Sequence, residues 1–351
     1  MTRVLALTRY DHVGASSRVR FLQYIPDLER KGLEITVHPL LSNESLARLY
    51  QDGRRSRADL LKALARRIAT VIREARADVI WLQQELFPFL PAAWETLLLG
   101  PRPYVIDFDD AYHLYYQHHA SGLVRSFYGD KVARLMRDAR TVVVGNDTLK
   151  ATAHAAGARD VRLVYSAVDT RRFEGGQPPQ KFTVGWIGTP MTAEQSLHVL
   201  REPLKKFLAE TGAACVLMGA DERQYPDIPA ARRPWSEADE AAFLPELSVG
   251  LCPLDDSPWT RGKSGYKIIQ YMSAGRAALT SPVGIAASLV EPGVTGFHCR
   301  TPEEWYAGLM TFYRDPALCA AQGAAARRIA VERYDLSVAA DALYKVLTAS
   351  A

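Results

Sequence analysis

The stretch Trp259-Thr-Arg-Gly-Lys-Ser-Gly-Tyr-Lys-Ile-Ile-Gln-Tyr-Met-Ser-Ala-Gly275 joins a polar loop to a helix. Its first seven residues have no apolar period, whereas apolar residues recur at helical spacing over Tyr266–Met272 and the closing glycine is a typical C-terminal cap. The first backbone N–H groups of a helix lack intrahelical partners, and together with the helix dipole they favour an anion such as phosphate. We therefore predict an anion site at the start of this helix, where Lys263 and Lys267 add positive charge.

The alternative interpretation is an ordinary helix with a small-residue loop and a solvated basic face, and the segments that follow argue against it. Ala277–Gly284 predicts a short buried strand that ends in a Ser-Pro-Val-Gly turn, and Glu291-Pro-Gly-Val-Thr-Gly-Phe297 comes next. This order of loop, helix, strand and Gly-Val-Thr-Gly-Phe resembles the donor half of glycosyltransferases with the GT-B fold. The resemblance is closest to the retaining family 4 (glycosyl transferases group 1).

The sequence departs from that family at two acidic positions. Family members usually begin the helix after Glu-Gly-Phe-Gly and carry a second Glu further along, which holds the nucleotide ribose while the loop amides hold the diphosphate. Here Gly262 and Gln270 stand at the two Glu positions. Gln270 can still hydrogen-bond a ribose hydroxyl, although without charge. The segment Lys263–Lys267 is similar to a branch of the family in which lysines replace the acidic pattern.

Short β-branched runs, each followed by a polar turn, recur along the chain and alternate with helical segments, which predicts mostly parallel sheets covered on both faces. A length of 351 residues favours two domains over one. We predict an α/β protein with two Rossmann-like, doubly wound domains that face a central cleft, as the GT-B resemblance implies. The other expected strands are Val4–Thr8, Glu34–His38, Asp78–Leu82, Tyr104–Asp107, Thr141–Val144, Val161–Tyr165, Phe182–Gly188, Ala214–Met218 and Val249–Pro253.

A domain boundary is expected at Gly175-Gly-Gln-Pro-Pro-Gln180, whose glycines and prolines are typical of a linker. Residues 1–177 then form an N-terminal domain that binds the acceptor. Residues 178–335 form a C-terminal domain that binds the nucleotide-sugar donor. Residues 336–351 are expected to form a terminal helix, which in the family crosses back onto the first domain.

The resemblance implies donor contacts from several small and basic residues of the second half. Ile187-Gly-Thr-Pro190 is similar to the family's first donor loop, but the Lys-Gly that usually follows is absent, so the basic contacts must come from the loop before the helix. Trp235 either stacks near a nucleotide base or is a buried structural residue. The donor candidates are Gly188, Thr189, Gly219, Arg261, Lys263, Ser264, Gly265, Lys267 and Gln270.

Candidate acceptor and catalytic residues lie after strands of the first half, where open α/β sheets bind ligands. In the GT-B fold the loop after the first strand contacts the acceptor or the diphosphate; its two arginines are alternatively ordinary surface residues. Asp107-Phe-Asp-Asp-Ala-Tyr-His113 resembles an Asp-Asp-Ala element of the family, and we take His113 and Asp109 as catalytic candidates, with a purely structural role as the alternative and no metal site expected. The acceptor candidates are Gly14, Ser16, Ser17, Arg18 and Arg20.

The composition fits a globular protein, with 48% hydrophobic and 23% charged residues. The absence of a long apolar run and of a leader-like N-terminus predicts a cytoplasmic protein. The four cysteines, Cys215, Cys252, Cys299 and Cys319, are scattered in apolar contexts without metal spacing, which predicts small core residues and no disulfides.

Positive charge is concentrated in the first half, where residues 1–177 hold 26 Lys and Arg against 20 Asp and Glu. The segment Arg54–Arg76 has eight basic and two acidic residues and an apolar stripe of Leu61, Leu64, Ile68 and Ile72. One interpretation is a peripheral helix packed by this stripe, with a solvated basic face. The other is peripheral contact with an anionic membrane, at the inner surface of the cell membrane. Nucleic acid is not expected, because no reader motif accompanies the charge.

Together these features predict a retaining, metal-independent glycosyltransferase that moves a sugar from a nucleotide-diphosphate sugar to an acceptor hydroxyl, for example in polysaccharide biosynthesis. The acceptor is a glycan, a lipid-linked saccharide or a small molecule. No cofactor is expected beyond the nucleotide-sugar co-substrate. A sugar-nucleotide epimerase of the same fold and a non-catalytic nucleotide or sugar binder are the alternatives.

Overall fold

The computed structural model describes residues 1–45, 48, 57–173 and 179–351, which form two compact units. The first unit comprises Met1–Ser166, Gly262–Ser264 and Leu336–Ala351, and the second comprises Ala167–Arg261 and Gly265–Asp335. The chain therefore changes unit at Ser166, some residues before the boundary expected from the sequence. The expected linker, residues 175–180, lies partly outside the described residues.

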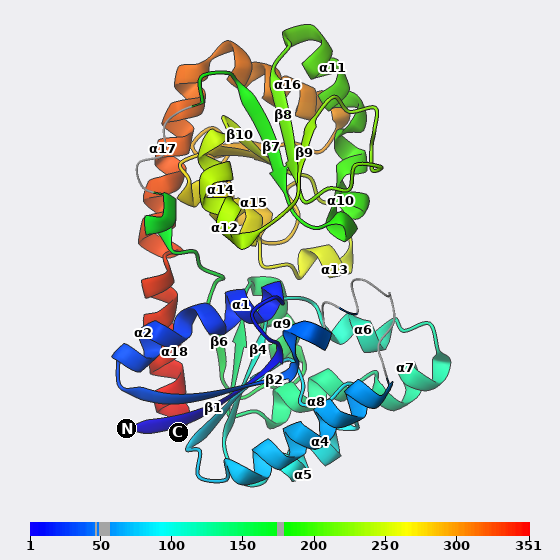
Figure 1. Ribbon diagram of the computed structural model, residues 1–351, viewed down its shortest axis with the longest axis vertical. Coiled ribbons are helices and arrows are strands. Elements are labelled where there is room, and N and C mark those ends of the chain that lie inside the picture. The colour runs from blue at the N-terminus through cyan, green and yellow to red at the C-terminus, as the bar shows by residue number, and fades with distance from the viewer. Residues whose placement is uncertain (46–47, 49–56, 174–178) are drawn as a thin grey trace. The chain divides into compact units, whose positions relative to one another are not determined.

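The first unit is built on a six-stranded parallel sheet with the order β2-β1-β3-β4-β5-β6 (Figure 1). Buried aliphatic residues fill its strands on both faces, as a doubly wound sheet requires. The strands are β1 (Thr2–Tyr10), β2 (Leu33–Leu41), β3 (Val79–Gln83), β4 (Tyr104–Phe108), β5 (Thr141–Val144) and β6 (Val161–Leu163).

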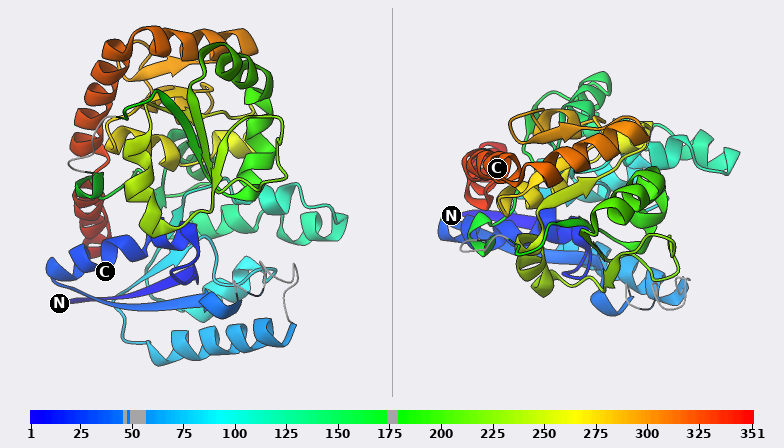
Figure 2. Two further views of the ribbon diagram at one scale, coloured as in Figure 1. Left: turned by 45° about the horizontal axis from the view of Figure 1, so that its top comes forward. Right: turned by 90° about the horizontal axis from the view of Figure 1, so that it is seen from above.

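Helices cover both faces of this sheet (Figure 2). One face packs against α4, α5, α8 and α9, whose apolar residues share a core with Leu5, Ile80 and Ile106. The other face packs against the N-terminal helices and α18, and there the Phe21 ring stacks on Trp81 at 4.1 Å. The helices are α1 (Ala15–Arg20), α2 (Ile25–Arg30), α4 (Arg57–Arg73), α5 (Ala92–Leu99), α6 (His113–Gln117), α7 (Gly122–Tyr128), α8 (Lys131–Asp138), α9 (Asp147–Ala155) and α18 (Leu336–Ser350).

The second unit has its own six-stranded parallel sheet, with the order β12-β11-β10-β7-β8-β9. One face packs on α11 and α16 around Trp186, Phe207 and Trp305, and α14 and α17 pack together elsewhere in the unit. All four cysteines are buried and free, as expected. The strands are β7 (Thr183–Ile187), β8 (Ala214–Met218), β9 (Ala231–Arg233), β10 (Val249–Cys252), β11 (Ala277–Thr280) and β12 (Gly296–His298). The helices are α10 (Pro190–Ser196), α11 (Arg201–Thr211), α12 (Glu237–Phe243), α13 (Pro258–Arg261), α14 (Tyr266–Ser273), α15 (Ala286–Leu289), α16 (Pro302–Arg314) and α17 (Pro316–Arg333).

The two doubly wound sheets confirm the predicted α/β class, and every expected strand is present. Two short edge strands, β9 and β12, escaped prediction. Between β1 and β2 the chain forms α1, a 3₁₀ turn at Leu22–Tyr24 and α2, which has a proline in its first turn. Among the described residues no helix combines the length and apolar character that crossing a bilayer requires.

Helix α4 is not packed by its apolar stripe, which was one of the two interpretations of the segment Arg54–Arg76. Its buried face consists of Ala63, Arg67, Thr70 and Val71, not of the apolar stripe. Three stripe residues point to solvent, since Leu61, Ile68 and Ile72 are 67%, 40% and 63% exposed. The buried Arg67 guanidinium donates to the Thr8 carbonyl, and burial lowers its pKa to about 9. The stripe is therefore not what packs this helix.

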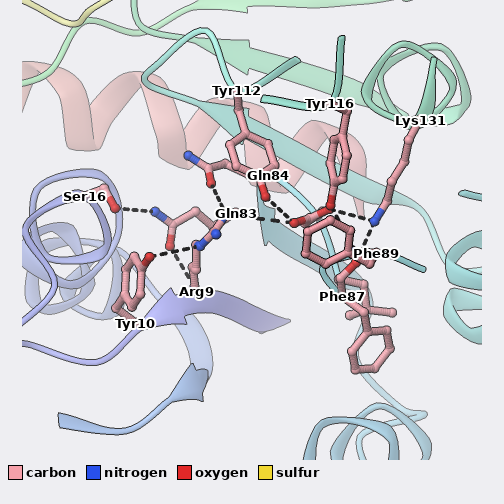
Figure 3. Close-up of polar contacts among 12 residues, drawn as sticks. Arg9, Tyr10, Ser16, Gln83, Gln84, Phe87, Phe89, Tyr112, Tyr116 and Lys131 are labelled. Atoms are coloured by element: carbon pink, nitrogen blue, oxygen red, sulfur yellow. Dashed lines mark hydrogen bonds and ion pairs between the residues drawn. The ribbon is translucent and has the colours of Figure 1, made fainter. Parts of the chain in front are cut away.

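A buried ion cluster holds the loop that follows β3 (Figure 3). The Lys131 ammonium, 1% exposed, lies 2.6 Å from Glu85 Oε2 and 2.7 Å from Glu95 Oε1, and it donates to the Phe87 carbonyl at 2.6 Å. Glu95 in turn accepts from the backbone N–H groups of Leu86 and Phe87 at 2.8 and 3.1 Å. Burial raises the pKa of Glu95 to about 7, against the opposing effect of the Lys131 charge. The cluster thus ties the loop to α5 and α8.

Replacing Lys131 by Met should destabilise the fold by about 3–5 kcal/mol, because the buried carboxylates of Glu85 and Glu95 would lose the ammonium group between them and, within the described part of the chain, only Glu85 would keep a cation, Arg9 at 3.9 Å. The measurement is urea unfolding at neutral pH. Arg134→Met on the same helix is the matched control: its ion pair with Asp130, at 2.6 Å, is exposed and should contribute no more than about 1 kcal/mol. Equal, small losses in the two variants would contradict the structural role of the cluster.

Candidate functional site

The carboxyl edge of the first sheet gathers polar side chains from the ends of β1, β3 and β4. Gln83 and Gln84 connect them. The Gln83 amide oxygen accepts from Arg9 N at 2.8 Å and from Ser17 Oγ at 2.6 Å, and its Nε2 donates to Ser16 Oγ at 3.2 Å (Figure 3). Gln84 accepts from the Arg9 guanidinium at 3.2 Å. This network sets the position of the loop after β1.

The structure separates the acceptor candidates into buried and accessible residues. Ser17 is fully buried, and Arg20 is 1% exposed with its guanidinium 2.8 Å from Asp107 Oδ1 and 2.8 Å from the Val164 carbonyl oxygen. Both therefore make internal contacts in place of the acceptor contacts that we expected. Ser16 and Arg18 are half-buried at the start of α1, and Gly14, the N-cap of that helix, leaves no room for a Cβ against the Tyr10 ring.

Three carboxylates lie at the end of β4 and directly after it, and their environments differ. Asp107 is the buried partner of Arg20, and burial raises its pKa to about 6. Asp109 is also buried and accepts from Gln84 Nε2 at 3.4 Å. Burial and the neighbouring Asp109 charge raise the pKa of Asp110 to about 7. Burial at this edge therefore favours the protonated form of these carboxyl groups.

His113 begins α6 beside these carboxylates in the sequence. Burial lowers its pKa, so the ring is neutral at pH 7, and its Nδ1 is buried with no hydrogen-bond partner among the described residues. A neutral imidazole with a free nitrogen can bind a substrate hydroxyl or accept a proton from it. Within the described part of the chain, no three His, Cys, Asp or Glu side chains form a group that could hold a metal ion.

Sequence reasoning missed Arg9, Gln83 and Gln84 as parts of this edge. The same rule that selected the Asp107–His113 segment would have found them, because Gln83 ends β3 and Gln84 follows it. It could not have revealed that the Arg9 guanidinium lies 4.9 Å from the Tyr112 ring centroid. Residues so far apart in the chain leave no local pattern.

In the second unit, two donor candidates, Gly188 after β7 and Gly219 after β8, lie with their backbones in close contact. Gly219 has φ +84°, and a Cβ there would lie 2.0 Å from the Gly188 carbonyl oxygen, so only glycine fits. Thr189 is the N-cap of α10, and its hydroxyl accepts from Thr192 N. Trp235 donates to Glu240 at 2.9 Å and is half-buried, which favours its structural interpretation.

Helix α14 begins as predicted. Gly265 is its N-cap in the left-handed region, with φ +68°, and a Cβ there would clash with Ile285 and Leu289. The Lys267 ammonium lies over the Trp186 ring, 4.2 Å from the centroid. Gln270 is 3% exposed, and its Nε2 has no hydrogen-bond partner among the described residues. The first two turns therefore combine backbone donors, a cation and a buried amide that still has a hydrogen bond to donate.

The loop before α14 is divided between the two compact units. Arg261 is exposed and makes a two-point contact with Asp256, at 2.6 and 2.9 Å, so its charge is already matched. Residues 262–264 belong to the first unit, where Asn146 Nδ2 donates to the carbonyls of Gly262 and Lys263 at 2.8 and 3.1 Å. Lys263 and Ser264 remain half-buried. Lys267 is therefore the cation that the second unit itself places at the start of α14, and Lys263 remains a candidate from the sequence.

Comparison with solved structures identifies the fold. The chain resembles the HepE protein of Anabaena in complex with UDP-glucose, with a TM-score of 0.74 at 17% identity over 99% of this chain and 100% of that one. It also resembles a glycosyltransferase from Rickettsia africae, with a TM-score of 0.71 at 13% identity over 100% and 99% of the two chains. Sucrose-phosphate synthase from Thermosynechococcus elongatus gives 0.71 at 13% identity over the whole of both chains. No protein-family model matches the sequence, and neither does any curated protein.

These similarities establish the fold alone, because the identities are low. The chain has the GT-B glycosyltransferase fold that its sequence predicted.

Replacing Lys263 by Ala should weaken binding of a nucleoside diphosphate by about 1.5–3 kcal/mol, the range for a hydrogen bond to a charged group. Isothermal titration calorimetry with UDP measures it. Arg261→Ala is the control, since that guanidinium is matched by Asp256, and its affinity should stay close to that of the wild type. Unchanged affinity in Lys263→Ala, or a larger loss in Arg261→Ala, would reject the assignment.

Proposed function

We propose that this chain is a retaining, metal-independent glycosyltransferase that transfers a sugar from a nucleotide-diphosphate sugar to an acceptor hydroxyl. The observation that carries the proposal is the start of α14, where Gly265, Lys267 and the buried Gln270 provide donors for an anion and a hydroxyl. The match of the whole chain to a solved glycosyltransferase and to a protein solved in complex with UDP-glucose supports it. Uridine nucleotides are the first donors to test.

The donor half of the mechanism is electrostatic. A nucleoside diphosphate leaves with additional negative charge on its terminal phosphate, and free N–H groups of α14, the helix dipole and the lysines stabilise that charge. The close contact of Gly188 and Gly219 fixes the backbone at the ends of β7 and β8. Gln270 donates to a ribose hydroxyl through its free Nε2.

The acceptor half uses the carboxyl edge of the first sheet. In a front-side displacement the leaving phosphate helps to deprotonate the acceptor, so no enzyme nucleophile is required. The neutral His113 orients a hydroxyl of the sugar or the acceptor, and Asp109 holds the edge through Gln84. We further propose that the acceptor is a glycan, a lipid-linked saccharide or a small hydroxyl compound, and that the protein acts in polysaccharide biosynthesis in the cytoplasm.

Incubation with a panel of nucleotide sugars and saccharide acceptors should release free nucleoside diphosphate and form a glycosylated product, as followed by mass spectrometry. Lys263→Ala should reduce turnover and Arg261→Ala should not. Anomeric analysis of the product tests retention, and activity in the presence of a chelator tests metal independence. An altered donor sugar without transfer would identify an epimerase. Binding without turnover would identify a binder, and either result would reject the transferase.

The exposed stripe of α4 supports peripheral contact with an anionic membrane. Leu61, Ile68 and Ile72 lie outward together with the basic residues Lys62 and Arg66. The neighbouring helix α5 adds two exposed residues, Trp94 and Leu97. Apolar side chains flanked by cations suit the boundary of a bilayer with anionic headgroups, where each basic residue contributes about 1 kcal/mol.

The protein should therefore sediment with vesicles that contain phosphatidylglycerol, but not with vesicles of phosphatidylcholine alone, and high salt should release it. Changing Leu61, Ile68 and Ile72 to Ser should abolish sedimentation. Changing Met191, Val294 and Val331, exposed apolar residues of the second unit, should not. Arg67 is unsuitable for this test because it is buried. If the wild type fails to sediment at low salt, or both triple variants behave alike, the membrane proposal is wrong.

A further inference from the structure

The first unit contains a large cavity away from the edge described above. Its volume is about 1030 Å³, and it is lined by the segments that precede β4, β5 and β6 at the amino edge of the sheet, together with Leu163 and Val164 at the end of the edge strand β6. Parallel strands place their amino and carboxyl ends at opposite edges, so this cavity does not belong to the edge that holds Asp109 and His113. The terminal helix α18 forms one of its walls through Ala342, Lys345 and Val346.

The lining of the cavity combines apolar walls with an excess of positive charge. Pro103, Leu163 and Val164 supply apolar surface. The charged lining consists of five cations, Arg102, Arg140, Arg159, Arg162 and Lys345, and two carboxylates, Asp138 and Asp160. If all are ionised, the cavity carries three net positive charges.

Both carboxylates already have partners. Asp160 accepts from Thr141 Oγ1 at 2.9 Å and pairs with Arg162 at 2.8 Å. Asp138 pairs with Arg137, which is outside the lining, at 3.4 Å. Neither carboxylate is therefore free to neutralise the remaining cations.

Four cations in the lining have no acidic partner among the described residues. Arg102 donates only to carbonyl oxygens, those of Leu99, Val71 and Glu74 at 3.0–3.1 Å. Arg140, Arg159 and Lys345 are exposed and make no ion pair or side-chain hydrogen bond within the described part of the chain. Like charges that face one space repel each other, and a bound anion would remove that repulsion.

We propose that this cavity is a second ligand site, which binds a small phosphorylated molecule apart from the donor site of the second unit. Arginine guanidinium groups match phosphate oxygens with paired hydrogen bonds, and four cations without an acidic partner suit a diphosphate. The volume is that of a pocket for a drug-sized molecule, and the apolar walls can hold the organic part of a nucleotide or sugar phosphate. The site does not depend on the proposed transferase function, because none of its residues belongs to the donor or acceptor candidates.

Inorganic pyrophosphate is the first probe, and hydrogen–deuterium exchange of the full-length chain locates its binding. Pyrophosphate should slow exchange in the peptides that contain Tyr104, Thr141 and Val346. Such protection is separate from any protection of α14, so the two sites are distinguishable. Repeating the measurement with UDP and with glucose 6-phosphate shows whether a nucleotide or a sugar phosphate is the better source of the phosphate group.

The variant Arg140→Ala/Arg159→Ala should lose this protection, and its dissociation constant for the cavity should rise at least about tenfold, since each lost contact is a charged hydrogen bond. Arg314→Ala/Arg328→Ala, which removes two exposed arginines of the second unit, is the charge-matched control and should retain the protection. Absence of cavity protection in the wild type, or equal loss in both double variants, would overturn the proposal.

Discussion

The first unit depends on the ammonium group of Lys131, which lies between two carboxylates in a space that excludes water. A buried charge is tolerated only where partners compensate for lost hydration, and here Glu85, Glu95 and a backbone carbonyl supply them. The same Glu85 accepts from the hydroxyls of Tyr112 and Tyr116, which belong to the segment that carries His113. One cation therefore determines where the candidate catalytic segment lies.

The loop held by this cluster has an unfavourable backbone. Gln84 and Phe89 both have positive φ, 62° and 58°, a conformation that costs energy for residues other than glycine. The N–H of Phe89 donates to the Tyr116 hydroxyl at 3.1 Å, which helps to hold that end of the loop. From this backbone conformation the Gln84 amide accepts from Arg9 and donates to Asp109. The ion cluster offsets this unfavourable backbone energy, and it thereby holds the carboxyl edge of the sheet in one position for a ligand.

The sequence predicted the sheets well because the burial of parallel strands leaves an unambiguous pattern of β-branched runs. It missed β9 because Ala231–Arg233 carries two arginines, which are usual only at a sheet edge. It missed β12 because a strand of three residues, Gly296–His298, gives too short a pattern. The start of α14 could be predicted because its signal is local: a loop, a glycine and a periodic helix lie together in the chain.

Long-range pairs could not be predicted from the sequence. Arg20 and Asp107 are 87 residues apart, and nothing near Arg20 distinguishes it from a surface residue of an amphipathic helix. In helix α4 the sequence identified the apolar face but not the direction in which that face points. Periodicity indicated an apolar face correctly, but it could not show that the inward face would be built on Ala63 and on Arg67, whose guanidinium donates to the Thr8 carbonyl. Periodicity identifies a face, and only tertiary contacts decide which way that face points.

The positive charge of the first half illustrates why burial, and not composition, assigns roles. Arg20 and Lys131 neutralise buried carboxylates and contribute nothing to an external field, because their charges are matched at contact distance. Arg140 and Arg159 have the same formal charge but face an open cavity without acidic partners. A count of residues treats these cations as equal. The net excess becomes informative only after the paired cations are removed. Among the cations that then remain in the described residues, Lys62 and Arg66 lie on the outer face of α4, and Arg140, Arg159 and Lys345 line the cavity at the amino edge of the sheet.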